Sequence, residues 1–111
     1  MTLRPPRMSS RTPQVAALDY EIAQEQASAL GRLGRALEIA LAALAAHDGR
    51  PLAHDQARRA ALVQDASDAL WCFIVQRESV GLRDPRPGFR QYSVPAEVQN
   101  RMGTFRSRHS F

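Results

Sequence analysis

The sequence predicts an all-α protein, a long antiparallel helical hairpin followed by a short C-terminal helix. Apolar residues recur at spacings of three and four from residue 13 to 47 and again from 52 to 80, as in amphipathic helices. A short stretch with glycine and proline separates the two. The chain has 111 residues, 44% of them hydrophobic, which is enough for a single helical domain that we place at 12–103.

The first predicted helix spans residues 13–47. Thr12 can cap its amino end, and Asp19 is a second possible cap. The helix ends near Gly49, which can adopt the left-handed cap conformation. Gly34 borders the apolar stripe, which indicates a surface where another segment approaches closely. The stripe consists of Val15, Leu18, Ile22, Leu30, Leu33, Leu37, Leu41 and Leu44.

The second predicted helix, residues 52–80, begins at Pro51 or at Asp55, which is a good capping residue. It ends before Gly81, and Leu82 is placed to pack back as in a Schellman ending. Two long helices joined by a short turn are expected to lie antiparallel.

The stretch DALWCFIV in the second helix carries large apolar side chains all round the helix. Leu70 and Phe73 face the first helix on a helical wheel, whereas Trp71 and Val75 point to the opposite side. Either the segment after this helix or a second subunit must cover the tryptophan. Because a lone hairpin buries little more than a seam, we predict a homodimer in which two hairpins form a four-helix bundle. The predicted interface residues are Trp71, Ile74, Val75 and Gly34.

The remaining segments flank or follow the hairpin. Residues 82–92 contain three structure-breaking residues among arginines and predict an arm without helical periodicity. A short helix is expected at 95–102, ended by Gly103. We predict that residues 1–11 form a disordered basic tail and that 104–111 form a mobile basic tail.

Positive charge is unevenly distributed along the chain. The net charge is +4 and all fifteen basic residues are arginine. Between residues 12 and 103, ten arginines oppose eleven acidic residues, a net charge of −1. Binding of nucleic acid or an acidic partner through the tails and the 82–101 arm is therefore an alternative function, which the nearly neutral body disfavours.

Arginines of the arm could converge on a phosphate or carboxylate, because the guanidinium group offers bidentate donors. Neighbouring acids and helix-end carbonyls could equally consume them in internal pairs, and this second interpretation is favoured. The candidate ligand-binding residues are Arg77, Arg83, Arg86, Arg90, Tyr92 and Arg101.

The triplet Ala-His-Asp occurs on both sides of the hairpin turn and brings together possible ligands for a divalent metal. Its members include His47, His54 and Asp55. Helix capping by the aspartate and a favourable position for a cation at the helix end explain these residues better. We therefore predict neither a metal nor a cofactor.

Several further functions are not supported by the sequence. Cys72 is the sole cysteine, so an intramolecular disulfide is impossible, and a reducing compartment, the cytoplasm, is expected. Its aromatic neighbours indicate a packed, inert thiol. No apolar run approaches the roughly 18 residues of a membrane span. No catalytic or small-molecule signature is recognisable, so we predict a protein that is not an enzyme.

The segment RESVGLRDPRPGFRQYSVPAEVQNRMG, with the preceding LVQDASDALWCFIVQ, resembles a small bacterial family of short all-helical proteins of unknown function. The resemblance covers residues 18–103. It implies a compact bacterial cytoplasmic protein and transfers no functional residue. The function predicted from the residues is that of a helical oligomerisation or protein-interaction module.

Overall fold

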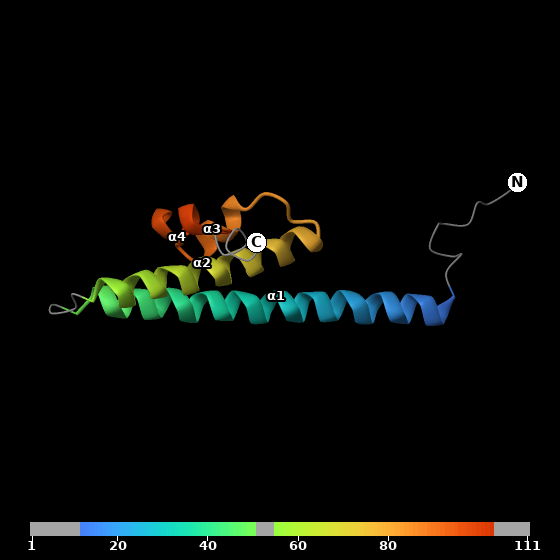
Figure 1. Ribbon diagram of the computed structural model, residues 1–111. Coiled ribbons are helices and arrows are strands. Elements are labelled where there is room, and N and C mark those ends of the chain that lie inside the picture. The colour runs from blue at the N-terminus through green and yellow to red at the C-terminus, as the bar shows by residue number, and fades with distance from the viewer. Residues whose placement is uncertain (1–11, 51–54, 104–111) are drawn as a thin grey trace, which may run out of the picture.

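A computed structural model describes residues 12–50 and 55–103, and in these ranges the chain is all-α, with four helices and no strand. The long helix α1 spans Pro13–Asp48 and the antiparallel helix α2 spans Gln56–Ser79. Two short helices follow, α3 at Arg86–Gln91 and α4 at Ala96–Arg101. Figure 1 shows α2 between α1 and the pair of short helices. The predicted tails lie outside the described residues.

Both long helices begin at side-chain caps. The Thr12 hydroxyl oxygen accepts a hydrogen bond from the Val15 amide at 3.1 Å, so Thr12 rather than Asp19 caps α1. At the start of α2, Asp55 Oδ1 accepts from the Arg58 amide at 2.9 Å. Of the two predicted starts of the second helix, the structure thus selects Asp55.

The two long helices end differently. Gly49 caps α1 with a φ of −79°, which is right-handed and corrects the predicted left-handed cap. After α2, Gly81 has a φ of +96° and its amide donates to the Glu78 carbonyl at 3.0 Å. The Leu82 amide donates to the Arg77 carbonyl at 2.8 Å. These two bonds and the positive φ are the predicted Schellman ending.

The core lies where α1, α2 and α4 meet. Leu37 and Leu70 are fully buried between the long helices, and Val98 of α4 is fully buried against α2. Ser67 is also buried, with its hydroxyl oxygen 2.8 Å from the Val63 carbonyl oxygen and 3.1 Å from that of Val98. The other buried apolar residues are Leu44, Leu62, Val63, Ala66, Phe73, Ile74 and Val94.

The predicted arm contains helix α3, which the sequence analysis missed. Pro85 precedes it and Pro87 lies in its first turn, where a missing amide proton is harmless. Gly88 packs so closely on α2 that a Cβ atom there would lie 3.2 Å from the Arg77 side chain and 3.3 Å from Phe73. A helix of six residues is too short to show a 3.6-residue apolar period, and for that reason its residues read as an irregular arm.

Gly103, which follows α4 in the same chain, lies against Trp71. A Cβ atom on Gly103 would lie 3.5 Å from the Trp71 ring, and the tryptophan is partly buried. Ile74 and Gly34, predicted at a dimer interface, are buried inside the single chain and cannot be part of such an interface. Val75 remains 42% exposed. The apolar turn of α2 therefore does not itself require a second subunit.

Cys72 is exposed, which corrects the prediction of a packed thiol. Cys72 lies on a part of α2 that no other described segment covers. Its aromatic neighbours in the sequence point to other faces.

The amino-terminal half of α1 has no neighbour among the described residues. With 36 residues against 24, α1 extends far beyond the end of α2 (Figure 1). All residues from 13 to 28, here called the free half of α1, are exposed. They include Val15, Leu18 and Ile22 of the apolar stripe, which are 43, 54 and 48% exposed. The stripe thus continues beyond the core of the single chain.

Candidate functional site

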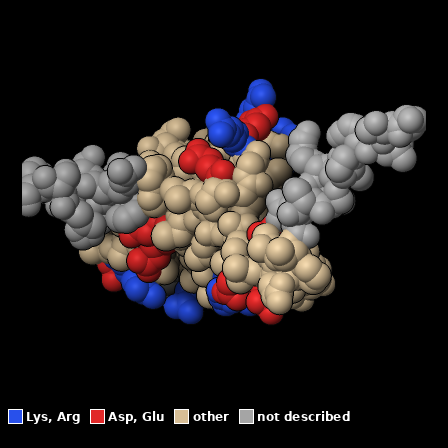
Figure 2. All heavy atoms as spheres, turned by 90° about the vertical axis from the view of Figure 1, so that its right-hand side faces the viewer, with Lys and Arg blue, Asp and Glu red and all other residues tan. Residues whose placement is uncertain are grey.

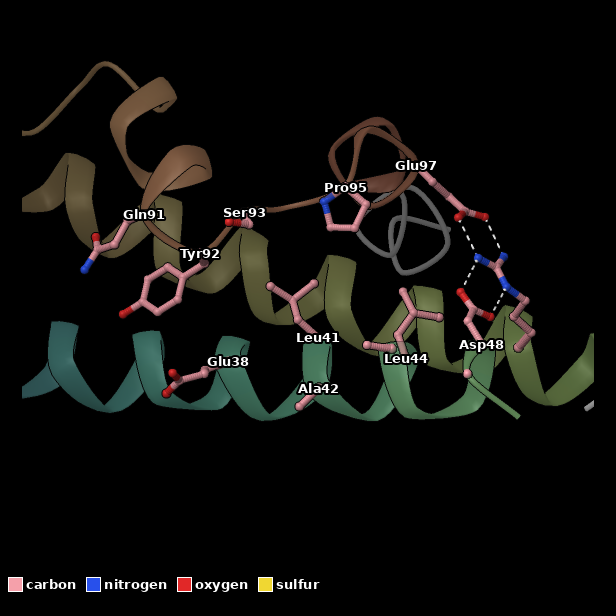
Figure 3. A pocket seen from close by; sticks show the side chains of 13 residues that line it. Glu38, Leu41, Ala42, Leu44, Asp48, Gln91, Tyr92, Ser93, Pro95 and Glu97 are labelled. Atoms are coloured by element: carbon pink, nitrogen blue, oxygen red, sulfur yellow. Dashed lines mark hydrogen bonds and ion pairs between the residues drawn. The ribbon is translucent and has the colours of Figure 1, made fainter. Parts of the chain in front are cut away.

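A groove with a volume of about 750 Å³ runs along the side of α1, and we call it the lateral groove. One wall is the carboxyl-terminal half of α1, and the other is the chain from the end of α3 to the start of α4 (Figure 3). Its apolar surface includes Leu41, Leu44, Ala45 and Pro95.

Tyr92 closes one end of the lateral groove. Its ring meets Phe73 edge-on, with centroids 5.3 Å apart and planes at 88°. A Cβ atom on Gly34 would overlap the Tyr92 hydroxyl and would lie 3.2 Å from Cζ and 3.4 Å from the Phe73 ring. The glycine in the middle of α1 therefore makes room for a tyrosine of the same chain. Ser93, with a φ of +51°, turns the chain away after the tyrosine.

Arg59 closes the other end of the lateral groove. Its guanidinium group donates to Asp48 at 2.7 and 3.0 Å and to Glu97 at 2.8 and 2.9 Å (dashed in Figure 3). These hydrogen bonds lower the pKa of both carboxyl groups and raise the pKa of Arg59. One side chain of α2 thus ties the end of α1 to the start of α4.

Sequence analysis did not identify Arg59, and no local pattern marks it. Its two acceptors lie 11 and 38 residues away in the chain, so only folding brings them together. The lateral groove also contains Glu38, which makes no ion pair with a described residue. Three carboxylates and one guanidinium give the groove a net charge of −2.

The arginines predicted to form an anion pocket do not converge. Arg77 is buried and donates to the Asp84 carbonyl at 3.0 Å, and Arg86 pairs with the Asp84 carboxylate at 2.9 Å. The hydrogen bonds from Arg86 lower the pKa of Asp84 to about 2. Both arginines thus follow the favoured alternative of internal pairing.

The other members of that cluster make no shared site with this pair. Arg83 and Arg101 are exposed, Arg90 is exposed but close enough to contribute to the lowered pKa of Asp84, and Tyr92 belongs to the lateral groove. At the top of the molecule in Figure 2, where Figure 1 places α3 and the loop before it, acidic side chains lie directly beside the basic ones. Glu78 and Arg83 line the same shallow depression. No continuous basic surface forms on this side.

The weak metal candidates are explained by helix ends. Asp55 caps α2, and His47 Nδ1 lies 3.6 Å from Asp48 Oδ1 in the last turn of α1. His54 lies outside the described residues. Within 12–50 and 55–103, no group of three or more His, Cys, Asp or Glu side chains could hold a metal ion.

The described residues thus form a helical hairpin with two short helices packed on it, a lateral groove, and a long helix whose first half contacts no other described helix. The chain belongs to DUF6665, a family of unknown function whose profile matches residues 6–109. No curated protein and no solved structure matches it. The match confirms the expectation of a family of unknown function. Among the described helices, none combines the length and the apolar character needed to cross a membrane.

Proposed function

We propose that this protein is a helical interaction module without enzymatic activity, which forms a homodimer through the free half of α1. The exposure of Val15, Leu18 and Ile22, on a helical segment that no other described helix covers, carries the proposal. Helices of 12 to 15 residues are marginal in water on their own, and their stability in proteins comes from packing of an amphipathic face. The free half has this length and such a face.

A second copy is the partner that the helix geometry favours. The helix α2 runs antiparallel to α1 and stops where the free half begins. A second α1, running antiparallel along the free half, would continue the line of α2 and cover the same stripe. The arrangement is self-complementary, as a twofold interface requires. Two free halves and two hairpins would together form an elongated four-helix assembly.

The dimer is expected to be weak. The contact would extend over only about 16 residues, or about 24 Å of helix. We expect the area that one such helix face buries to be below the roughly 800 Å² per partner in stable complexes. The free half also carries Asp19, Glu21 and Glu25 and no basic residue, so two copies repel each other. We expect dissociation in the micromolar range.

The test is a matched pair of double substitutions in the full chain. Val15→Glu with Ile22→Glu places two carboxylates in the apolar stripe, whereas Ala17→Glu with Gln24→Glu adds the same charge at the same spacing on the opposite face. Sedimentation equilibrium at 5 to 200 micromolar should show a monomer for the first variant and a dimer for the wild type and the second variant. A wild type that stays at 12.3 kDa over this range refutes the homodimer.

A different partner would give a different result. If the wild type is monomeric, the free half binds another protein instead, and its acidic flanks favour a basic amphipathic helix as the partner. If both double variants remain dimeric, the copies associate through another surface. Circular dichroism must show equal helix content in both variants for the comparison to hold.

A further inference from the structure

We propose that the lateral groove binds the arginine-rich residues 1–11 of a second copy of the chain. The lateral groove has a volume of about 750 Å³, with apolar and acidic side chains in its lining. The placement of this segment beside the groove rests on the homodimer proposed above, whereas the complementarity of charge and apolar surface between segment and groove does not.

The lateral groove is suited to an extended cationic segment. It is floored by Leu41, Leu44 and Ala45 and lined at one end by the Tyr92 ring. Arg59 already satisfies two of its carboxylates, yet Glu38 has no ion pair with a described residue. A net charge of −2 over an apolar floor attracts a ligand with both cationic and apolar side chains.

Residues 1–11 have this chemistry. They contain Arg4, Arg7 and Arg11 without any acidic residue, together with Leu3 and two methionines. The pair Pro5-Pro6 favours an extended backbone, and proline-containing segments dock in grooves lined by aromatic rings at a small loss of conformational entropy. The free half of α1, with three acidic residues and no basic one, is also opposite in charge to residues 1–11.

The distance that eleven residues can span requires the segment in the groove to come from another copy. From Pro13 to Glu38, α1 rises about 37 Å, whereas eleven fully extended residues span at most about 40 Å. A chain's own segment would therefore reach only the near end of its lateral groove, and its arginines would lie along α1 before the groove begins. In the antiparallel dimer, Pro13 of the second copy would lie beside the end of the free half, about 15 Å of helix rise from Glu38, and the chain before it would continue toward the groove.

The dependence on salt separates this arrangement from simple pairing of the apolar stripes. The free halves repel each other through their acidic residues, so salt should strengthen a dimer held by the stripes alone. Attraction between residues 1–11 and the lateral groove acts in the opposite direction. We therefore expect dimerisation to weaken between 50 and 500 mM NaCl.

Charge reversal tests the contact directly. In the full chain, Arg4→Glu with Arg7→Glu, and separately Glu38→Arg, should each weaken dimerisation roughly two- to tenfold, since exposed ion pairs contribute about two- to fivefold each and reversal adds repulsion. The chain with all three substitutions should recover most of the loss. Asp65→Arg is the matched control, because this exposed residue lies in the middle of α2, away from both the groove and the end of α2 where the second copy would enter, and should leave dimerisation unchanged. Equal effects of Glu38→Arg and Asp65→Arg, or no recovery in the triple variant, overturn the proposal.

A peptide experiment distinguishes failure of this inference from failure of the homodimer. A fluorescein-labelled peptide of residues 1–13 is titrated with the full chain, and anisotropy should show binding that Glu38→Arg weakens and Asp65→Arg does not. If Val15→Glu with Ile22→Glu does not alter the mass but the peptide binds in this way, the proposed dimer is wrong and the groove assignment holds. If the stripe variant is monomeric and the peptide does not bind, only the groove assignment is wrong.

Discussion

Gly31 and Gly34 lie one turn apart in α1, and alanine at each position tests whether Tyr92 requires the missing side chain. Alanine in a helix interior is favoured over glycine by about 1 kcal/mol. At Gly31 no atom lies within 4 Å of the added methyl group, so Gly31→Ala should raise the free energy of unfolding by about that amount. At Gly34 the methyl group overlaps the Tyr92 hydroxyl and approaches the ring that packs on Phe73.

The clash at Gly34 should outweigh the gain in helix propensity. Overpacking of a core costs about 1 to 3 kcal/mol, and the edge-on aromatic pair contributes about 0.5 to 1.5 kcal/mol that a displaced Tyr92 would lose. After subtraction of the propensity gain, Gly34→Ala should be destabilising by about 0.5 to 3.5 kcal/mol. The two variants should thus differ by about 1.5 to 4.5 kcal/mol, which urea denaturation followed by circular dichroism at 222 nm resolves at one fixed protein concentration.

Removal of the hydroxyl group provides the internal control. Tyr92→Phe alone should change stability little, because its hydroxyl fills space beside Gly34 and no described hydrogen bond is lost. Combined with Gly34→Ala, it should recover part of the loss, so that the two changes are not additive. If Gly34→Ala stabilises the protein as much as Gly31→Ala does, the close approach of Tyr92 to α1 is not what that glycine provides.

Three further predictions follow from the same structure. Arg59 lowers the pKa values of the Asp48 and Glu97 carboxyl groups from 3.8 and 4.5. The stability that these ion pairs contribute is therefore present above those values and is lost as the pH falls through the folded-state pKa values. The wild type should thus lose more stability than Arg59→Leu between pH 6 and pH 2.5, and parallel urea midpoints of the two proteins would contradict this. Val98→Ala removes two methyl groups from a fully buried side chain and should be destabilising by about 2 kcal/mol, with amide exchange fastest in α4; an unchanged exchange pattern would show that α4 does not depend on this contact. Cys72 should react with a thiol reagent such as 5,5′-dithiobis(2-nitrobenzoic acid) in the native protein without denaturant; a reaction that requires unfolding would mean that the thiol is covered, for instance by a second subunit.

The parts of the fold that could be predicted are those that depend on local chemistry. Thr12 and Asp55 cap helices because a hydroxyl or carboxylate accepts from an amide three residues on, and this spacing is visible in the sequence. The Schellman ending at Gly81 and Leu82 likewise needs only a glycine that tolerates positive φ and an apolar residue after it. Apolar periodicity fixed the extent of α1 to within one residue.

The site depended on contacts that no local pattern encodes. The pairing of Arg59 with Glu97 joins residues 38 positions apart, and the sequence contains other acids that could have competed for it. The partner of Gly34 was expected to be a second subunit and is Tyr92 of the same chain, because α3, too short to show a period, returns the chain to α1. The residues after α2 pack on one side of this helix, so that Trp71 is partly covered and Cys72 remains exposed to solvent.

By itself the sequence determined an all-α hairpin, its helix ends and the separation of basic tails from a nearly neutral body, since caps, periodicity and charge are properties of neighbouring residues. Only the tertiary structure decided that α1 outruns α2, that a lateral groove with a net charge of −2 forms between α1 and the arm, and that the arginines of the arm do not converge. The physical reason is that a groove or an uncovered stripe depends on where distant segments stop and pack, and those positions are set by the core as a whole.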